Sequence, residues 1–452
     1  MTPDSSQLTA RRIAAFWAPL AATWIMMSVE GPFLAAVVAR LPAPKENLAA
    51  FGVAFSLALV FEAPVIMLMA AVTALARDAR STERLRRFSY GLSALVTAAL
   101  AVAVLPPVFR VLADGLFGLP APVARLAHPA LVLLLPWPGV IGYRRFLQGV
   151  LIRVGRTRRV GVGTAVRLAG MAATALVLAP SGLAGALVGA AALSAGVTAE
   201  ALAVRLMAGK ALAELRGIPE AAPAPGYRDI ARFYLPLALS TLLTLAVHPT
   251  VTFFLARARE PVGSLAVFPV VRSLVFLFSC LGLSYQEVGI ALLGENREGY
   301  RALRRFALGL GLATSAGLAV VVLSPLSRVW FADVSGLRPD LVRLALVPAA
   351  LLVPVPALTV ALSFLRALFV NSGRTGPVTT STAAEVGAIA VGLAVGIAGF
   401  DWIGVTAGAA ALDVGRVAST AVLALAARRL WTPAGAAGMI PAKDARSSGK
   451  TG

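Results

Sequence analysis

The sequence contains few of the residues on which disulfides, metal sites and soluble enzymes depend. Cys280 is its only cysteine, which excludes an internal disulfide. Its two histidines, His128 and His248, disfavour a dedicated zinc site, because such sites draw several Cys or His ligands. Charged residues make up only 14% of the chain, against about 25% in an ordinary soluble domain. We therefore expect no metal, no resident cofactor and no enzyme activity.

Apolar residues are abundant and are gathered into long runs. Hydrophobic residues account for 58% of the chain, and the mean hydropathy is +0.83. Each run is close to the ~20 residues that a helix needs to cross a bilayer. These runs predict an all-α polytopic membrane protein with twelve transmembrane helices. The predicted spans are 13–38, 48–76, 88–112, 127–152, 160–180, 182–206, 230–256, 264–293, 303–331, 343–370, 377–399 and 402–427.

The second half of the chain repeats the first at an offset of 217 to 219 residues. The segment FWAPL at 16–20 is matched by FYLPL at 233–237. Six spans in each repeat give both halves one orientation, so a pseudo-twofold axis should run along the membrane normal. In a membrane protein such a duplication is typical of a secondary transporter with a central cavity. Further matches are Arg40 with Arg257, Gly118 with Gly336, Pro136-Trp137-Pro138 with Pro354-Val355-Pro356, and Gly155-Arg156-Thr157 with Gly373-Arg374-Thr375.

Basic residues predict how the chain is oriented. The net charge is +20, and most of the 41 Lys and Arg residues fall in predicted loops on one side. The positive-inside rule places that side, with both termini, in the cytoplasm. Because the charges are spread over short loops, we expect no nucleic-acid partner. We expect a monomeric multi-pass protein of the inner (plasma) membrane, with lipid and a small-molecule substrate as its partners.

The predicted domains follow the repeat. Residues 1–208 should form the N-terminal six-helix bundle and 229–430 the C-terminal one, joined by a cytoplasmic linker at 209–228 that is rich in Pro and Ala. Residues 431–452 are expected to be a disordered cytoplasmic tail. A phosphate-binding loop ending at Lys450-Thr451 would need glycine at position 444, which is aspartate. An ion or solute gradient is therefore the expected energy source.

Prolines at equivalent positions predict broken helices in both repeats. Pro136 and Pro138 fall in the fourth span, and Pro354 and Pro356 in the tenth; Pro32 and Pro249 fall in the first and seventh. A proline inside a helix removes one hydrogen bond and frees a carbonyl group. In lipid this is tolerated where other helices, water or a cavity satisfy the carbonyl. These breaks indicate either a solute pathway or kinks kept for packing.

Titratable groups fall inside the predicted spans of both repeats. Glu30 lies in the first span and Glu62 in the second, whereas their equivalents are Val247 and Ser279. A charge at such depth is costly. Each carboxylate should therefore either bind H⁺, Na⁺ or a cationic solute, or form a buried ion pair. His248 is a candidate proton sensor or a hydrogen-bonded core histidine.

Four arginines inside the spans are candidates to bind an anion. Arg144 and Arg145 lie one to two turns after Pro138, and Arg272 and Arg366 are in the second repeat. A guanidinium facing a cavity suits a phosphate or carboxylate group. The alternative is that each is neutralised by one of the acids within the spans.

Other charges suggest a gate or local pairs. Arg167 and Glu385 occupy equivalent positions in spans five and eleven, so they either form an ion pair between the halves or belong to two local pairs. Asp413 and Arg416 are spaced to pair on one helix face. Glu200 is expected near the cytoplasmic end of its span, within reach of lipid headgroups.

Several short motifs carry a family resemblance. The segment YRRFLQG at 143–149, followed by Gly-Arg-Thr at 155–157, resembles the MOP flippase superfamily, which includes the multidrug and toxic compound extrusion (MATE) transporters. Within it, FYLPLAL at 233–239 and Val-Pro-Val-Pro at 353–356 most resemble the progressive ankylosis (ANK) family. The resemblance covers about residues 10–430.

The resemblance implies a V-shaped pair of bundles that work by alternating access. Its ankylosis-like branch implies export of pyrophosphate, nucleotide or small polycarboxylate anions, and its extrusion branch implies proton- or sodium-coupled export of organic cations. The chain departs from both. The extruders' acid falls about one turn beyond Glu30, at Leu34 and Ala35, and the ankylosis-like arginine falls near Val360.

We therefore expect a secondary active exporter of a small solute, with an anion favoured by the inner arginines. The alternatives are a proton- or sodium-coupled multidrug cation antiporter, a flippase for a lipid-linked saccharide, and a non-transporting membrane scaffold. An intramembrane enzyme would need convergent Asp, His, Ser or metal ligands, which the scattered acids do not supply.

Overall fold

A computed structural model describes residues 8–219, 225–294, 298–372, 374 and 376–429. Within these ranges the chain is helical, and its one β-type contact is an isolated bridge. The helices of the first repeat are α1 (Ala10–Ser28), α2 (Glu30–Ala39), α3 (Pro44–Ile66), α4 (Leu68–Leu75), α5 (Ala79–Ala103), α6 (Pro106–Arg110), η2 (Val111–Phe117), α7 (Ala121–Leu133), α8 (Trp137–Arg153), α9 (Arg158–Leu178), η3 (Ala179–Ser181) and α10 (Gly185–Arg216).

The second repeat has the same order of helices and breaks. Its helices are α11 (Tyr227–Leu245), α12 (Val247–Leu255), α13 (Pro261–Leu292), α14 (Tyr300–Leu323), α15 (Leu326–Arg328), η4 (Val329–Val334), α16 (Pro339–Leu351), α17 (Val355–Asn371), α18 (Gly376–Ala394), η5 (Val395–Gly399) and α19 (Gly404–Arg429). In the described ranges, eleven segments are long and apolar enough to cross a membrane. A twelfth candidate, α5 with α6 and η2, is bent by 72°. The prediction of an all-α polytopic protein is confirmed, with eleven candidate spans in the described ranges, or twelve if the bent segment is counted as one.

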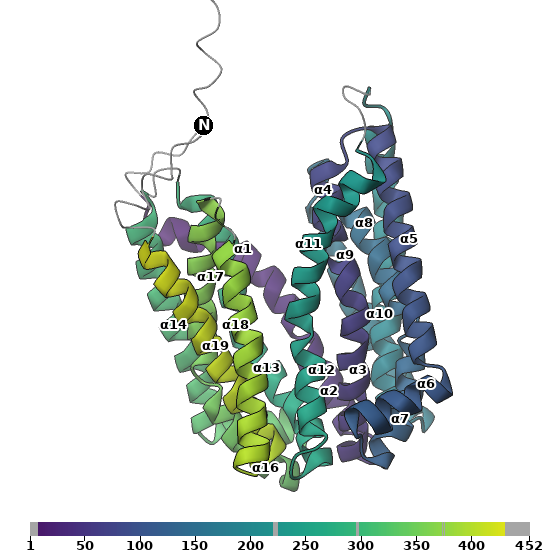
Figure 1. The fold of residues 1–452 in the computed structure, drawn as a ribbon, viewed down its shortest axis with the longest axis vertical. Helices are drawn as coiled ribbons and strands as arrows, with labels where there is room; N and C mark the ends of the chain where they lie inside the picture. The colour runs from purple at the N-terminus through teal and green to yellow at the C-terminus, as the bar shows by residue number, and fades with distance from the viewer. Residues whose placement is uncertain (1–7, 220–224, 295–297, 373, 375, 430–452) are drawn as a thin grey trace, which may run out of the picture.

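The two repeats form two bundles that converge at one end and diverge at the other (Figure 1). Helices α2–α10 make up the first bundle and α12–α19 the second. At the diverging end α1 begins, α19 ends, and the arginine-rich start of α5 is found. This is the end at which the charge distribution predicts the cytoplasm.

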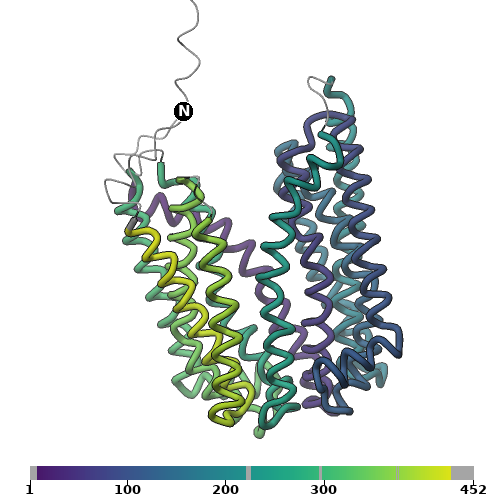
Figure 2. Tube along the Cα trace, viewed as in Figure 1, coloured from purple at the N-terminus to yellow at the C-terminus, as the bar shows by residue number. Residues whose placement is uncertain are grey.

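The first helix of each repeat crosses to the opposite bundle. Helix α1 packs along α13, and α11 packs along α3 (Figure 2). The indole Nε1 of Trp17 donates to the Ser284 hydroxyl at 2.8 Å and to the Leu281 carbonyl at 3.3 Å. Its repeat equivalent, Tyr234, donates its hydroxyl to the Pro64 carbonyl. Each bundle therefore anchors a helix that comes from the other half of the sequence.

The predicted domain ranges differ in detail from this packing. The range 1–208 was expected to form one bundle, but its first helix packs on the second bundle, because Trp17 finds its partners there. Helix α10 continues to Arg216, inside the range predicted as a linker. Residues 220–224 of that linker and the predicted tail 431–452 lie outside the described residues.

Prolines account for the kink at which each crossing helix changes direction. Helix α1 ends at Ser28, and Pro32 lacks the N–H that would bond to the Ser28 carbonyl. In the same way α11 ends at Leu245, four residues before Pro249. Glu30, the first residue of α2, therefore lies directly at the first kink.

The fourth span of each repeat is also broken at its prolines. Helix α7 ends at Leu133 and α8 begins after Pro136, while α16 ends before Pro354 and α17 follows it. The Ser194 hydroxyl of α10 donates to the Leu133 carbonyl at 2.7 Å. A carbonyl near the break is thus satisfied by a neighbouring helix of the same bundle, as lipid requires.

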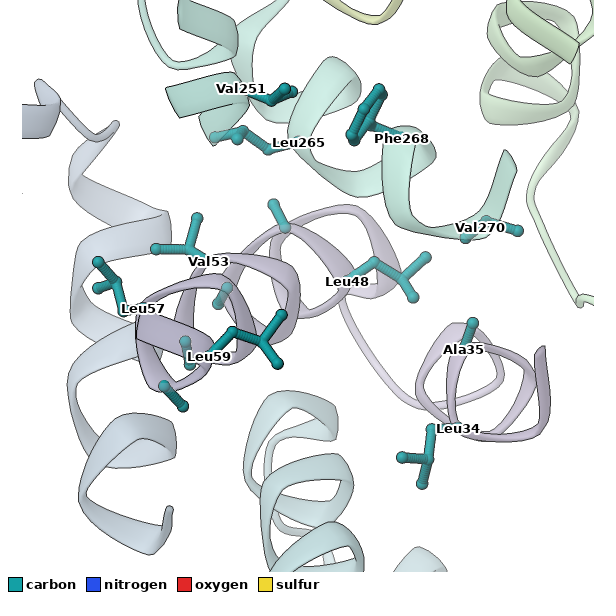
Figure 3. Close-up of a cluster of buried hydrophobic side chains, with 14 of the residues drawn as sticks. Leu34, Ala35, Leu48, Val53, Leu57, Leu59, Val251, Leu265, Phe268 and Val270 are labelled. Atoms are coloured by element: carbon teal, nitrogen blue, oxygen red, sulfur yellow. The ribbon is translucent and has the colours of Figure 1, made fainter. Parts of the chain in front are cut away.

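At the converging end the bundles meet through α3 and α13. Figure 3 shows Val53 of α3 pointing towards Leu265 of α13. A Cβ added to Gly52 would lie 2.8 Å from Cγ of Pro269, so this crossing needs glycine. The close approach buries apolar side chains of both bundles in one continuous core.

An arginine of the first bundle also hydrogen-bonds to the second bundle at this end. Arg40, just after α2, donates from Nη2 to the carbonyls of Asp333 at 2.5 Å and Val334 at 3.1 Å, where η4 ends. Gly336 has a φ of +70°, and a Cβ there would lie 2.9 Å from Nη1 of Arg40. A cation at a helix C-terminus is electrostatically favourable because the free carbonyls carry partial negative charge.

An arginine of the second bundle makes the equivalent hydrogen bonds to the first bundle. Arg257, just after α12, donates to the Phe117 carbonyl at 2.5 Å and to the Leu116 carbonyl at 2.7 Å, where η2 ends. Gly118 follows with a φ of +61° and faces the guanidinium. Because Arg40 and Arg257 are repeat equivalents, we call these two contacts the arginine clasps.

Candidate functional site

A cavity of about 370 Å³ lies between the bundles. Its lining comes from α1, α2, α3 and α10 of the first repeat and from α11, α12 and α13 of the second. Of the charged or titratable side chains, Glu30, His248 and Arg272 line it. All three were sequence candidates, and the structure brings them to one cavity from both repeats.

The lining follows the repeat in its apolar part and departs from it in its charged part. Phe51 and Phe268 are repeat equivalents, and both line the cavity. Arg272 stands where the first repeat has Phe55, which also lines the cavity. Glu30 has an apolar equivalent in the second repeat. The two walls therefore differ in chemistry although they match in backbone arrangement.

The carboxylate of Glu30 is already paired. Arg167 of α9 donates to Glu30 Oε1, and each of these side chains is 13% exposed. Arg167 also lies 3.7 Å from a carboxylate oxygen of Glu200. The negative charge of Glu30 is therefore neutralised by Arg167 where Glu30 lines the cavity.

Glu200 corrects an expectation. It was expected near the cytoplasmic end of its span, but it is 1% exposed at the middle of α10, a helix of 32 residues. Arg144 donates to its Oε2, and Gln148 donates to its Oε1 at 3.0 Å. The expectation failed because α10 extends well beyond the predicted end of the span. Arg144 is consequently neutralised inside the first bundle and is not among the residues that line the cavity.

Two further candidates of the first bundle also lie away from the cavity lining. Arg145 approaches the Met69 sulfur at 3.8 Å, and its Nε is buried without a hydrogen-bond partner among the described residues. Glu62 is 7% exposed in α3. No ion pair within 4 Å joins Glu62 to Arg145 in the part of the chain that the structure describes.

The predicted gate is not formed in this structure. Arg167 pairs with acids of its own bundle, and Glu385 accepts from Arg416 at 3.3 Å in the other. Arg167 and Glu385 therefore belong to two separate ion pairs, one in each bundle, as the alternative interpretation of the sequence expected. Because Arg416 is taken by Glu385, the expected pair with Asp413 is also absent, and Asp413 Oδ1 is buried without a hydrogen-bond partner among the described residues.

Arg272 differs from the other inner arginines because it lines the cavity. Among the described residues it has no ion-pair partner within 4 Å, and its guanidinium lies 6.0 Å from the ring centre of Phe268. His248 of α12 lines the same cavity. Arg366 instead donates to the Thr382 hydroxyl at 3.5 Å and is not among the lining residues.

The prolines at the breaks are likewise outside the lining. Pro32 and Pro249 kink the helices whose neighbouring residues line the cavity, whereas Pro136, Pro138, Pro354 and Pro356 break helices inside each bundle. Sequence reasoning missed Phe51 and Phe268, although their equivalence in spans two and eight was a usable signal. In the described ranges, no three His, Cys, Asp or Glu side chains gather as a metal site.

Comparison with known proteins identifies the fold. No protein-family model matches the sequence, and neither does any curated protein. The lipid II flippase MurJ, in an inward closed conformation, matches with a TM-score of 0.74 and 11% identity over 91% of this chain and 87% of that chain. An inward-facing multidrug resistance MATE family transporter of the MOP superfamily matches with a TM-score of 0.68 and 16% identity over 90% of this chain and 94% of that one.

A third match is a MOP superfamily transporter from Pyrococcus furiosus, with a TM-score of 0.63 and 15% identity over 93% of this chain and 96% of that chain. It is described as having a binding pocket of reverse polarity that suggests a different function. An outward-facing MATE structure matches with a TM-score of 0.61, below the 0.68 of the inward-facing one. The chain has the fold of MATE and other MOP superfamily transporters.

Proposed function

We propose that this protein is a secondary active transporter that exports a small solute across the inner (plasma) membrane by alternating access. The observation that carries the proposal is the cavity between two repeat-related bundles that are joined at one end and diverge at the other. Rocking of the bundles would expose such a cavity to each side of the membrane in turn. The kinked crossing helices α1 and α11 supply contacts that such a motion can exchange.

An anionic solute is favoured over a cation. Glu30 is neutralised by Arg167, whereas Arg272 lines the cavity with no ion-pair partner among the described residues. The cavity therefore carries an excess of positive charge, which suits a carboxylate- or pyrophosphate-like group. This agrees with the ankylosis-like resemblance of the sequence.

The remaining parts of the proposal concern coupling and surroundings. A gradient of H⁺ or Na⁺ would drive transport, with no resident cofactor. The protein would act as a monomer in the bilayer with both termini in the cytoplasm, since the diverging end carries the arginine-rich loops.

Two rival functions each have one observation in their favour. A proton- or sodium-coupled cation antiporter would use Glu30, which lines the cavity, and multidrug transporters share the fold. A lipid-linked saccharide flippase is favoured by the similarity to MurJ. A non-transporting scaffold has no use for charges at membrane depth, which are costly to keep.

The test is uptake by proteoliposomes of the purified protein. Labelled pyrophosphate, labelled citrate and a fluorescent cationic dye are compared with and without a pH or Na⁺ gradient, and lipid II flipping is measured in parallel. We expect anion transport that Arg272→Gln abolishes and that Arg125→Gln, an exposed arginine of α7 outside the cavity lining, leaves intact. Gradient-driven dye uptake lost in Glu30→Gln would instead support the cation antiporter.

A further inference from the structure

Resting on the proposed transport function, we propose that the cavity selects amphipathic organic monoanions. The acid group of the solute binds Arg272, and its apolar body lies on the aromatic wall, which we define as Phe51, Phe55 and Phe268. This narrows the substrate class from small anions in general to acids that carry one charge and a ring system or a compact hydrocarbon body.

The charge of the cavity argues for a single negative charge. Among the described residues, Arg272 is the one arginine that lines the cavity, and the Glu30 carboxylate is held by Arg167. A second negative charge would enter a region of low polarity without a matching cation, which carries a large desolvation cost. Pyrophosphate and citrate, with several charges each, are therefore poorer ligands than an acid with one.

Hydroxyl groups in the lining are already engaged. Ser56 and Thr252 hydrogen-bond to each other across the bundles at 2.9 Å, and the Ser273 hydroxyl donates to the Val270 carbonyl at 2.8 Å. They offer little to the sugar or polyhydroxyl part of a solute. The guanidinium of Arg272 and the imidazole of His248 are the polar side-chain groups of the lining that remain to fix the orientation of a ligand.

The apolar side of the cavity argues for a hydrophobic body. The Phe51 and Phe55 rings are stacked with their centres 6.3 Å apart, and Phe55 packs 5.5 Å from Trp137 behind it. Phe268 lines the cavity from the second repeat, beside Arg272, and its ring packs against Gly408 of α19. A ring bound against this aromatic lining would bury apolar surface on aromatic side chains, which is favourable beyond simple burial.

The size of the cavity sets an upper bound on the ligand. Its volume of about 370 Å³ is near the lower end of the roughly 300–1,000 Å³ typical of ligand pockets. One or two fused rings with an acid group fit this space, whereas a lipid-linked saccharide would have to extend beyond it.

Three probes that share one naphthalene body separate charge from shape. The probes are 2-naphthalenesulfonate, the neutral 2-naphthalenesulfonamide and the cationic 2-naphthyltrimethylammonium. Their binding to the detergent-purified full chain is measured by isothermal titration calorimetry, with protein-free micelles subtracted. We expect the sulfonate to bind at least tenfold more tightly than either analogue.

Variants then assign the two parts of the site. Arg272→Gln should reduce the preference for sulfonate to twofold or less, and Arg272→Lys should restore most of it. Phe51→Ala should weaken all three probes by similar factors, with Phe51→Leu as the milder change. Arg125→Gln should leave every affinity unchanged. Each variant must elute as a monodisperse peak in size-exclusion chromatography.

Uptake measurements show separately whether the inferred ligand class is wrong and whether the proposed transport function is wrong. If proteoliposomes take up pyrophosphate or the cationic dye while 2-naphthalenesulfonate is neither bound nor transported, the monoanion inference is wrong and transport stands. Equal binding of all three probes, or tighter binding of the cation, overturns it as well. If sulfonate binds through Arg272 but no solute crosses the membrane, the ligand class stands and the transport proposal fails.

Discussion

The arginine clasps lead to a quantitative prediction about the conformational equilibrium. Replacing Arg40 and Arg257 together with glutamine, which is shorter and uncharged, removes the cationic hydrogen bonds that join the bundles at the converging end. We expect the double variant to shift the population from the state that is closed at this end towards the state that is open there. The stability of each separate bundle should change little, because the lost bonds run between bundles.

The expected size follows from the geometry. Each arginine bonds two carbonyls of the opposite bundle, but both side chains are exposed, so solvent and salt weaken the contacts. We take about 1 kcal/mol for each clasp after this discount. The two clasps are separate contacts and should be nearly additive, so the double variant changes the ratio of the two states by about 30-fold and each single variant by about 5-fold.

Distances between spin labels on the two bundles can measure this ratio. A Cys280→Ser background allows one label pair at the converging end, Ala121→Cys with Asp340→Cys, and another at the diverging end, Lys210→Cys with Arg304→Cys. These four positions are exposed. Double electron–electron resonance in nanodiscs should show the first distance lengthen and the second shorten in the double variant.

A matched control tests whether the clasp itself matters. Arg110, an exposed arginine at the end of α6, makes no hydrogen bond to the other bundle within the described part of the chain. Arg110→Gln should leave both distance distributions unchanged. If Arg40→Gln with Arg257→Gln behaves like this control, the clasps are only surface contacts and the reasoning is refuted.

Three further predictions concern the anchors, the buried ion pairs and the clasp glycine. Trp17→Phe combined with Tyr234→Phe removes one anchoring donor from each crossing helix, about 1 kcal/mol each, and should populate a shorter distance at the diverging end in the same resonance experiment. Glu200→Gln leaves buried arginine charge unpaired and should lower the free energy of unfolding by about 3–5 kcal/mol. The control Glu214→Gln, at an exposed ion pair, should change it by less than about 1 kcal/mol. Denaturation of the purified proteins measures both free energies. Gly336→Ala strains a left-handed residue by about 1–3 kcal/mol and crowds the guanidinium that packs on it, so it should reproduce at least the single-clasp shift in the label distances.

Hydropathy and the repeat predict this fold well, because hydropathy is read from each segment alone and the repeat from a comparison of the two halves of the sequence. Each apolar run predicts one transmembrane helix. Each proline predicts one lost backbone hydrogen bond, so the kinks at Pro32 and Pro249 follow from the sequence alone. The packing of α1 on the opposite bundle does not. It depends on Trp17 meeting Ser284, a contact between residues far apart in the chain that no local pattern announces.

The candidate site was predictable only in part, for a related reason. Membrane depth marks a charge as costly but does not say which face of its helix it occupies. Glu30 and Arg272 line the cavity, whereas Arg144 points into its own bundle, where Glu200 neutralises it. Predicting that pair would have required the true length of α10. Local ion pairs within one bundle hold six of the inner charges, namely Glu30, Arg144, Arg167, Glu200, Glu385 and Arg416.

The duplication divides the molecule into a symmetric part and an asymmetric part. Two kinds of contact that join the bundles occur twice: the anchors of Trp17 and Tyr234, and the clasps of Arg40 and Arg257. In the alternating access that we propose, each pair would be exchanged when the bundles rock, and similar strength on both sides would let them exchange together. Charges at the cavity occur once, since Arg272 has a phenylalanine as its equivalent. A binding site on a twofold axis would otherwise present two equal cationic walls. In the proposed transporter, the loss of symmetry at Glu30 and Arg272 would therefore give a solute a single orientation, while the duplicated anchors and clasps are retained.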